Sequence, residues 1–193
     1  KAHIEQGIHP KRMYEPSAGG GVFISEAATI FPDIEQITAV EKDRLTGLVL
    51  SAINSTLPVK ATTHVSGLEE APVSDNGSYD LVVSNIPFGN FSVYDEAYPD
   101  KALSVKIHNY FFAKGLDKLS DGDLMAYITT DAFLNNPSNH TARQYLFERA
   151  DLVAVAVMPD NLMKDTGNTE APSHLLIVQK HHNKEQLSDS EQL

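Results

Sequence analysis

Two short stretches of the chain combine residue types that could do chemistry. The first, "EPSAGGGVF", runs from Glu15 to Phe23 and places an acidic residue before three consecutive glycines. The second, "SNIPFG", runs from Ser84 to Gly89 and ends an apolar run with an amide, a proline and an aromatic ring. Glycines let a backbone turn tightly and approach a ligand closely. Core packing requires neither the glycine run of the first stretch nor the polar and aromatic end of the second, so both stretches are candidate binding sites.

The glycine turn differs from the turn that binds dinucleotides. That fingerprint is G-x-G-x-x-G, whereas Gly19, Gly20 and Gly21 are adjacent here. Glu15, at the end of the expected first strand, would repel a pyrophosphate and would suit a cofactor with a cationic or amino group. Glu41 lies twenty residues after Gly21, where a carboxylate can accept hydrogen bonds from ribose hydroxyls. These residues favour S-adenosylmethionine, and by themselves they leave NAD open as a ligand.

The second stretch is suited to hold an amino group. Asn85 offers a side-chain carbonyl that accepts a hydrogen bond. The residue before a proline is biased away from helical conformations, so Ile86 and Pro87 should keep the chain extended with their backbone carbonyls available. Phe88 offers a flat surface on which a planar base or amide can stack. An amino nitrogen held by two acceptors loses conjugation and can attack a methyl sulfonium, which predicts methyl transfer to an exocyclic NH2.

The elements that must position these stretches alternate between strand and helix. Strand-like apolar runs occur at 11–16, 36–41, 59–65, 79–84, 124–130, 151–159 and 174–180. Helical spacing occurs at 21–31, 42–54, 101–119 and 140–150. This alternation is typical of a doubly wound α/β sheet, and the last two strands lack a helix between them, which favours antiparallel pairing. We therefore expect a Rossmann-like, seven-stranded, mostly parallel sheet with an antiparallel last strand.

The ligand of such a sheet binds at the carboxyl ends of the strands. The first and fourth strands should be neighbours, so the loops at 15–21 and 85–89 should face each other across a crevice. Tyr94 and Tyr98 follow the second loop and are expected either to cover the base or to lie in a solvated loop. The loop-like segment 160–172 could close the substrate side or simply connect two strands.

The two stretches together resemble a known family. "EPSAGGGVF" resembles the first motif of the N6-adenine DNA methylase family of amino-methyltransferases, and "SNIPFG" resembles its (Asn/Asp/Ser)-Pro-Pro-(Phe/Tyr) catalytic motif, in the same order. The resemblance covers about residues 10–180. It implies that S-adenosylmethionine is bound by Glu15, Pro16, Ser17, Ala18, Gly19, Gly21, Phe23, Glu41, Lys42, Leu68 and Glu69. It also implies a catalytic motif of Asn85, Ile86, Pro87 and Phe88, with Phe88 stacking on a base flipped out of the duplex.

The sequence departs from the family pattern at two positions. Ile86 stands where the family usually has proline, although its backbone carbonyl is retained. At the end of the third strand, Gly67 stands where the family usually has an aspartate that contacts the cofactor adenine. Glu69 or Glu70 is expected to take that role, with Leu68 as the apolar neighbour.

Length and composition limit the remaining possibilities. The chain has 193 residues and no cysteine, which fits one catalytic domain over 1–183 with a polar tail over 184–193. It has no run long and apolar enough for a membrane span or signal peptide, so we expect a cytoplasmic protein. The eight histidines show no metal-ligand spacing, so no metal is expected. The chain begins with Lys1 rather than Met, and we expect it to be a fragment of a longer protein.

The net charge of −11 bears on the expected substrate. Phosphate contacts dominate affinity for DNA, so we expect DNA to be gripped by regions absent from this chain. The leading hypothesis is an S-adenosylmethionine-dependent methyltransferase of adenine in DNA. Two alternatives remain open: an amino-methyltransferase of protein glutamine or RNA guanine, and a degenerate methylase module without catalysis.

Overall fold

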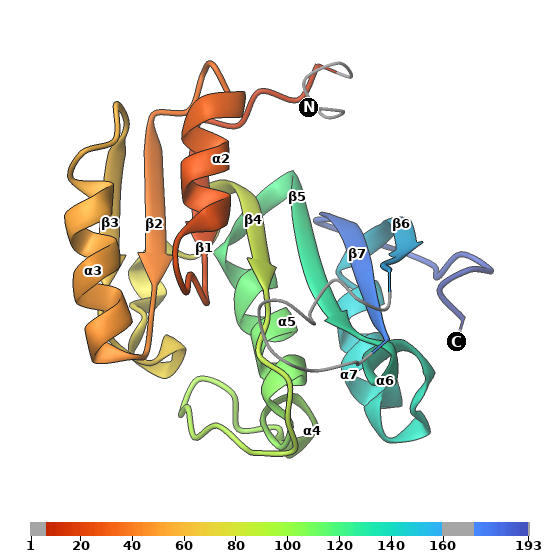
Figure 1. Ribbon diagram of the computed structural model, residues 1–193. Helices are drawn as coiled ribbons and strands as arrows, with labels where there is room; N and C mark the ends of the chain where they lie inside the picture. Colours follow the sequence, from red (N-terminus) through yellow and green to blue (C-terminus); the bar gives the residue numbers. More distant parts are fainter. Residues whose placement is uncertain (1–6, 160–171, 193) are drawn as a thin grey trace.

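The computed structural model describes residues 7–159 and 172–192, which form one seven-stranded sheet with helices on both faces (Figure 1). The strands are β1 (Arg12–Glu15), β2 (Gln36–Val40), β3 (Lys60–His64), β4 (Tyr79–Asn85), β5 (Leu119–Thr130), β6 (Ala150–Val157) and β7 (Ser173–Lys180). The helices are α2 (Val22–Ile30), α3 (Arg44–Asn54), α4 (Lys101–Ser104), α5 (Ile107–Lys118), α6 (Asp131–Asn135) and α7 (His140–Phe147). Short 3-10 helices are η1 (Leu68–Glu70), η2 (Val73–Asp75) and η3 (Pro137–Asn139).

The strand order confirms the predicted fold class. The sheet runs β3-β2-β1-β4-β5-β7-β6, and the pairs among β1 to β5 are all parallel. β7 lies between β5 and β6 and is antiparallel to both. The order reverses direction at β1 and β4, which is the switch point where such sheets bind ligands. This is the Rossmann-like, mostly parallel sheet with an antiparallel last strand that the sequence predicts.

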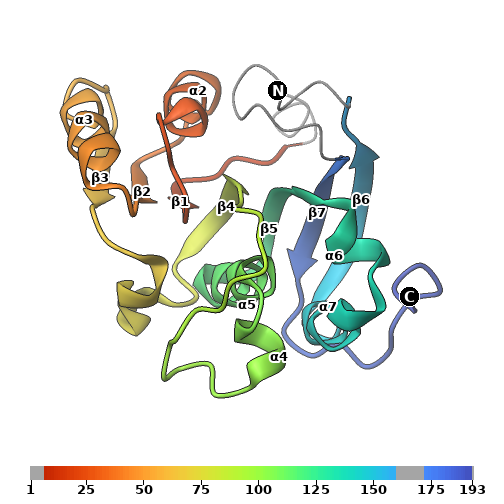
Figure 2. The ribbon, with the colours of Figure 1, turned by 60° about the horizontal axis from the view of Figure 1, so that its bottom comes forward.

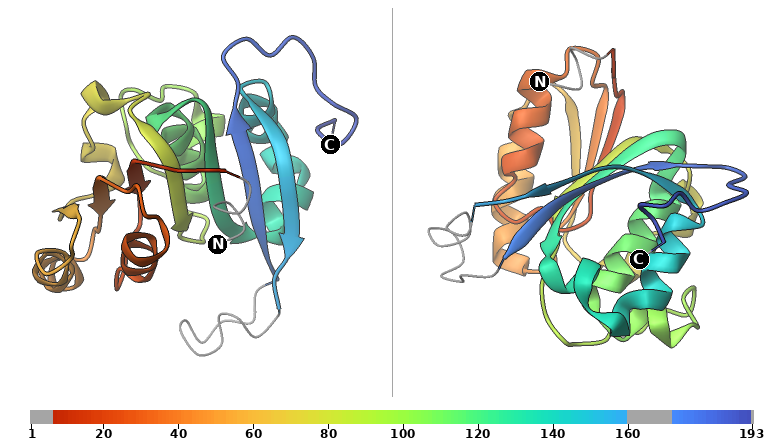
Figure 3. Two further views of the ribbon diagram at one scale, coloured as in Figure 1. Left: turned by 90° about the horizontal axis from the view of Figure 1, so that it is seen from above. Right: turned by 90° about the vertical axis from the view of Figure 1, so that its right-hand side faces the viewer.

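Helices cover the sheet in two layers, and each layer has its own apolar cluster. α2 and α3 lie on one face, while α5, α6 and α7 lie on the other (Figure 3). On the first face Ile24 and Leu50 pack against the sheet, and on the second Phe112 packs against Val82 and Tyr127. Full burial of one such side chain contributes roughly 1.5–3 kcal/mol. None of the helices in the described part of the chain is long and apolar enough to cross a membrane.

The helix predicted over 101–119 is wrong as a single element. The structure has α4 and then α5, with the backbone of Lys106 extended between them at φ −125° and ψ 134°. The Nζ atom of Lys106 donates to Ser138 Oγ at 2.5 Å and to Asn139 Oδ1 at 2.9 Å. These are contacts with a distant segment, and they hold the break between two stretches that each have helical periodicity.

The region around β5 and α7 also differs from the prediction. β5 begins at Leu119 and includes the "SDGD" stretch that was expected to be a turn. Leu119 pairs with Tyr79 before the register shifts, and Gly122 has a φ of 87°. α6 and η3 precede α7 and were not predicted. The other strands and helices lie close to their predicted bounds.

Two residues of the polar tail, Lys184 and Glu191, contact the edge strand β6. The Nζ atom of Lys184 lies 2.7 Å from Glu191 Oε1, and these side chains are 6% and 2% exposed. The same Oε1 accepts a hydrogen bond of 2.7 Å from the backbone N of Leu152 in β6. An edge strand presents unpaired backbone donors, and Glu191 satisfies one of them.

Candidate active site

The loops that leave β1 and β4 lie side by side at the carboxyl edge of the sheet, onto which Figure 2 looks. β1 pairs with β4 through Met13 with Leu81 and Tyr14 with Val82. This confirms the prediction that the first and fourth strands are neighbours. The Oγ atom of Ser84 lies 3.4 Å from the backbone O of Ser17 in the opposite loop, so the two predicted motifs meet across a single crevice.

The turn after β1 requires glycine for two separate reasons. Gly19 and Gly21 have φ values of 51° and 78°, in a region that residues with a Cβ rarely adopt. A Cβ on Gly21 would lie 2.4 Å from Leu50 Cδ1 of α3. The backbone N of Gly21 donates to Ala18 O at 2.9 Å, and the N of Ala18 donates to Val40 O at 2.9 Å. The turn is therefore pressed against α3 and tied to the end of β2.

Glu41 connects this turn to the start of α3. Its Oε2 accepts a hydrogen bond of 2.7 Å from Gly19 N, and its Oε1 accepts one of 2.7 Å from Asp43 N. Asp43 in turn accepts from Thr46 N and caps α3. Each carboxylate oxygen has a second lone pair, so Glu41 retains acceptor capacity for a ligand while it holds the turn.

Glu15 lies beneath the turn with an unsatisfied oxygen. The residue is 1% exposed, and its Oε2 has no hydrogen-bond partner in the described part of the chain. Burial raises the pKa of this carboxyl group well above its ordinary value, and the nearby carboxylate of Glu41 raises it further. Buried polar atoms are normally hydrogen-bonded. A ligand that brings an amino or cationic group to this turn would satisfy Glu15, so the residues fit the predicted S-adenosylmethionine.

A cavity of about 310 Å³ opens beside the turn. Among the residues predicted to bind the cofactor or to form the catalytic motif, those that line it are Pro16, Ser17, Glu41, Lys42, Leu68, Glu69 and Pro87. Ala18, Gly19 and Gly21 form the turn itself, and Phe23 packs against the apolar cluster under α2. The predicted set therefore contains two kinds of residue: some line the cavity, and others support the lining residues without contacting the cavity.

The cavity distinguishes the two acidic candidates that follow β3. Glu69 lines it, and its Oε1 lies 3.4 Å from the Nζ of Lys42 on the opposite side. Glu70 instead turns back, and its Oε1 accepts a hydrogen bond of 3.2 Å from Gly67 N at the start of η1. Leu68 precedes both glutamates and is buried. Of the two, Glu69 has the position from which a bound ligand can be reached.

The predicted catalytic motif begins inside the sheet. Asn85 is the last residue of β4 and pairs with Ile128 of β5. Ile86 is 1% exposed, belongs to the apolar core, and donates its backbone N–H to Ile128 O at 3.2 Å. Proline has no N–H to donate, so Ile86 makes a sheet contact that the usual family residue could not make. Pro87 then reaches the cavity, and Phe88 is half-buried next to it.

The loop after the motif contributes a wall that the sequence did not predict. Gly89 has a φ of 149°, and a Cβ there would lie 2.6 Å from Phe91 Cε1. The residues that line the cavity without having been predicted are Val40, Ser66, Phe91, Ser92, Val93, Ile107 and Phe111. Tyr94, which was expected either to cover the base or to lie in a solvated loop, also lines the cavity. Tyr94 is 83% exposed, whereas Tyr98 is buried at 7%. The two tyrosines therefore have different roles, and segment 160–171, which was expected near this side, lies outside the described residues.

Comparison with known proteins gives two informative relatives by sequence and one solved structure with a similar fold. Defense against restriction protein B of Escherichia phage P1 is 28% identical over 171 residues, which are 86% of this chain and 7% of the phage protein. Type II methyltransferase M.XamI of Xanthomonas campestris pv. amaranthicola is 27% identical over 163 residues, 77% of this chain and 31% of that enzyme. The M protein of the type I restriction enzyme EcoKI has the same fold, with a TM-score of 0.76 at 14% identity over 93% of this chain and 42% of that one.

These relatives are much longer than the chain, which spans 7% and 31% of the two curated proteins. The family model for the Eco57I restriction-modification methylase matches residues 27–161. That range includes Glu41, which is predicted to bind the ribose, and the motif from Asn85 to Phe88. The chain therefore belongs to the Eco57I restriction-modification methylase family.

Proposed function

We propose that this chain is the catalytic domain of a DNA methyltransferase that moves a methyl group from S-adenosylmethionine to the exocyclic amino group of adenine. The cofactor is the one that the family and the class I fold imply. One observation carries the proposal: the glycine turn and the motif Asn85–Phe88 meet at the edge of one cavity. When bound, the cofactor supplies an electrophilic methyl group on a sulfonium.

Glu15 beneath the glycine turn and the residues that line the cavity have separable tasks toward that cofactor. Glu15 accepts from its amino group, because its buried oxygen has no other partner in the described part of the chain. Glu41 accepts from ribose hydroxyls with the lone pairs that Gly19 and Asp43 leave unused. Leu68 and Glu69 contact the adenine ring and its amino group from the end of β3.

The catalytic motif acts on the target base. The side-chain carbonyl of Asn85 and the backbone carbonyl of Ile86 accept hydrogen bonds from the two N–H groups of the target amine. These two hydrogen bonds would localise the lone pair on the amino nitrogen and leave it available to the methyl group that a bound cofactor would supply. The proton leaves the product nitrogen afterwards, so no base is needed before transfer. Phe88 stacks on the base, which must be flipped out because its amino nitrogen is out of reach in the duplex.

The DNA itself is gripped outside this chain. A net charge of −11 opposes contact with phosphates, and the curated relatives have most of their length beyond the matched region. At physiological salt, we expect the chain alone to bind duplex DNA weakly.

A second candidate function is a methylase module without catalysis. It is favoured by the phage P1 relative, whose name refers to defence against restriction. Methylation of a protein glutamine or an RNA guanine would use the same amide clamp and remains a third possibility for the substrate. The three functions share the fold and cavity and differ in whether, and to what, a methyl group is transferred.

Two measurements test the proposal. Calorimetric titration of S-adenosylmethionine into the wild-type protein should give binding, and Glu41→Ala should weaken it strongly. Transfer of labelled methyl groups to adenine-containing DNA should then depend on Asn85. Absence of binding by the wild type would overturn the methyltransferase function altogether. Binding without transfer to DNA, RNA or protein would instead support the non-catalytic module.

A further inference from the structure

A buried ion pair joins the loop after the catalytic motif to α5. Asp95 Oδ2 lies 2.8 Å from the Nζ of Lys114, and the two side chains are 8% and 3% exposed. The same oxygen accepts a hydrogen bond of 2.6 Å from Tyr110 Oη, and Oδ1 accepts one of 2.9 Å from Ala97 N. Burial favours a raised pKa at Asp95, but the hydrogen bonds from Lys114, Tyr110 and Ala97 outweigh it and lower the pKa.

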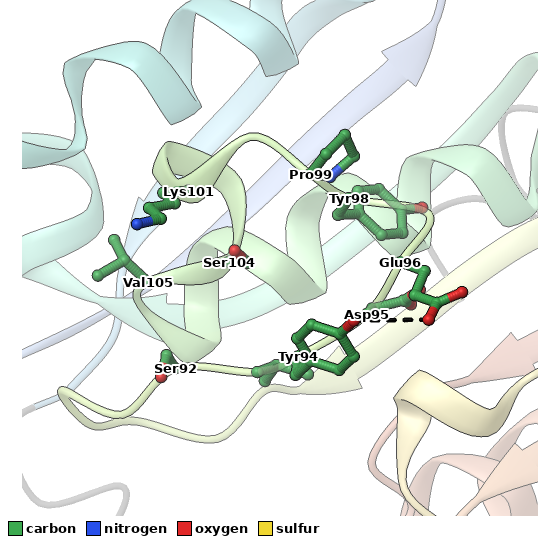
Figure 4. A pocket seen from close by; sticks show the side chains of 10 residues that line it. Ser92, Tyr94, Asp95, Glu96, Tyr98, Pro99, Lys101, Ser104 and Val105 are labelled. Atoms are coloured by element: carbon green, nitrogen blue, oxygen red, sulfur yellow. Dashed lines mark hydrogen bonds between the residues drawn. The ribbon is translucent and has the colours of Figure 1, made fainter.

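Tyr98 contacts both residues of this ion pair. Its Oη donates a hydrogen bond to the carboxylate of Asp117, and its backbone N donates to Asp95 O at 3.0 Å. Its ring lies edge-on to that of Tyr110, with 5.4 Å between centroids. The Nζ of Lys114 lies 5.5 Å from the centre of the Tyr98 ring. Figure 4 shows Asp95 and Tyr98 on the same loop as Ser92 and Tyr94.

The face of α5 that holds Asp95 also builds the cofactor cavity. Ile107 and Phe111 line the cavity, and Tyr110 and Lys114 lie three and seven residues after Ile107. Residues three, four and seven apart share one face of a helix. The contacts of Lys114 and Tyr110 with Asp95 therefore fix the loop relative to the helix face that lines the cavity.

The residues just before Asp95 form the opposite wall. Ser92, Val93 and Tyr94 line the 310 Å³ cavity and also a second cavity of about 560 Å³ beneath the loop (Figure 4). The backbone N of Val93 donates to Ser104 O at 2.9 Å, which holds this wall at one point. Asp95 is the second attachment. Without Asp95, the segment between the two cavities would be held by the Val93 contact before it and, after it, by Tyr98 through Asp117.

A buried ion pair is a costly way to stabilise a protein, because well-packed apolar residues of similar size often do as well or better. The Asp95–Lys114 ion pair is therefore better explained by its effect on the position of the loop than by a contribution to stability. Resting on the proposed function, we propose that Asp95 is a positioning residue. Through Lys114 and Tyr110 it sets where the wall segment Phe91–Tyr94 lies, and thereby the shape of the cofactor cavity.

The first test measures cofactor affinity in the Asp95→Asn variant. Asparagine has nearly the same shape and can still accept from Ala97 N, but it cannot pair with the charge of Lys114. We expect calorimetry to give a dissociation constant for S-adenosylmethionine at least about tenfold higher, which is about 1.4 kcal/mol. In turnover, KM for the cofactor should rise by more than kcat falls. Glu96→Gln removes an exposed charge one residue away and should change affinity by less than about twofold.

A second variant separates positioning from stability. Asp95→Asn with Lys114→Met leaves no unpaired buried charge, so its melting temperature should recover toward the wild-type value. If Asp95 positions the wall, the weakened cofactor affinity should persist in this double variant. Recovery of wild-type affinity together with stability would overturn the proposal.

A third measurement does not depend on the cofactor. Backbone hydrogen exchange of the unliganded protein should become faster in residues 91–98 of the Asp95→Asn variant and remain unchanged in β1 and α2. Unchanged exchange in this segment would refute the positioning role even if the wild type bound no S-adenosylmethionine. Absence of S-adenosylmethionine binding by the wild type would refute the proposed function, and it is a separate result from the exchange measurement.

Discussion

The carboxylate of Glu41 accepts a 2.7 Å hydrogen bond from the backbone N of Gly19, so the acidic end of β2 and the glycine turn after β1 form one unit. The second oxygen of Glu41 is bound to Asp43 N in the same way. The residue proposed to hold the ribose therefore also determines the conformation of the turn. Cofactor affinity and local stability should change together when it is replaced.

Glu41→Ala leaves the N–H groups of Gly19 and Asp43 without their acceptor. We expect a stability loss of roughly 1–3 kcal/mol and at least about tenfold weaker binding of S-adenosylmethionine. Calorimetry and urea denaturation check the two effects. Glu35→Ala is a matched control, because Glu35 is exposed and pairs only at the surface with Lys11. Equal effects of both replacements would contradict the role of Glu41.

Gly21→Ala tests the shape of the turn. Gly21 has a φ of 78°, and a Cβ would lie 2.4 Å from Leu50 Cδ1. Strain at a positive φ costs roughly 1–3 kcal/mol, and overpacking against Leu50 adds to it. Gly20→Ala serves as the control, since no atom lies within 4 Å of its Cβ position and its φ is not positive. Thermal denaturation should show a large loss for the first variant and a small one for the second.

Asn85→Ala should separate binding from chemistry. The side chain proposed to orient the amine is lost, while the lining residues Pro16, Ser17 and Glu41 are unchanged. We expect S-adenosylmethionine to bind nearly as well as to wild type, and methyl transfer to fall by about 10²–10³-fold. Asn90→Ala replaces an exposed amide in the same loop and should retain most of the activity. A variant at Asn85 that still transferred methyl groups at the wild-type rate would exclude the proposed clamp.

Ile86→Pro should destabilise the protein although it restores the usual family motif. It removes the N–H that donates to Ile128 O and empties part of the core around a side chain that is 1% exposed. Losing the apolar contacts alone costs roughly 2–5 kcal/mol. Ile86→Val keeps the N–H and should cost only about 0.5–1.5 kcal/mol. Chemical denaturation distinguishes them, and a more stable proline variant would show that the sheet contact is unimportant.

Stability should fall in acid through Glu191. Burial favours a raised pKa, but hydrogen bonds from Lys184, Leu152 N and Ser188 outweigh it and lower the pKa from 4.5 to about 2. A lowered folded-state pKa contributes stability above the unfolded value, and that contribution is lost as pH falls from about 4.5 toward 2. Screening by solvent keeps the contribution below the value of about 3 kcal/mol that the full shift would give. Glu191→Gln should flatten the dependence of unfolding free energy on pH in this window, whereas an unchanged profile would rule out this contribution.

Local patterns in the sequence were sufficient for the order of elements and the two motifs. Apolar runs and helical spacing depend on neighbouring residues, so most strands and helices lie close to the predicted bounds. The antiparallel last strand followed from the missing helix between two strands. By contrast, the helix predicted over 101–119 is split, because Lys106 is held by Ser138 and Asn139 from a distant segment.

The sequence by itself predicted that Glu15, the glycines, Glu41 and the motif Asn85–Phe88 lie at one edge of the sheet, because each is at or just after the carboxyl end of a parallel strand. The tertiary structure alone decided what completes that site. It placed Glu69 rather than Glu70 at the cavity, and it brought Ile107 and Phe111 of α5 to the wall. It also buried the pair of Asp95 and Lys114. Such choices depend on distances between segments far apart in the chain, which no local spacing of residues specifies.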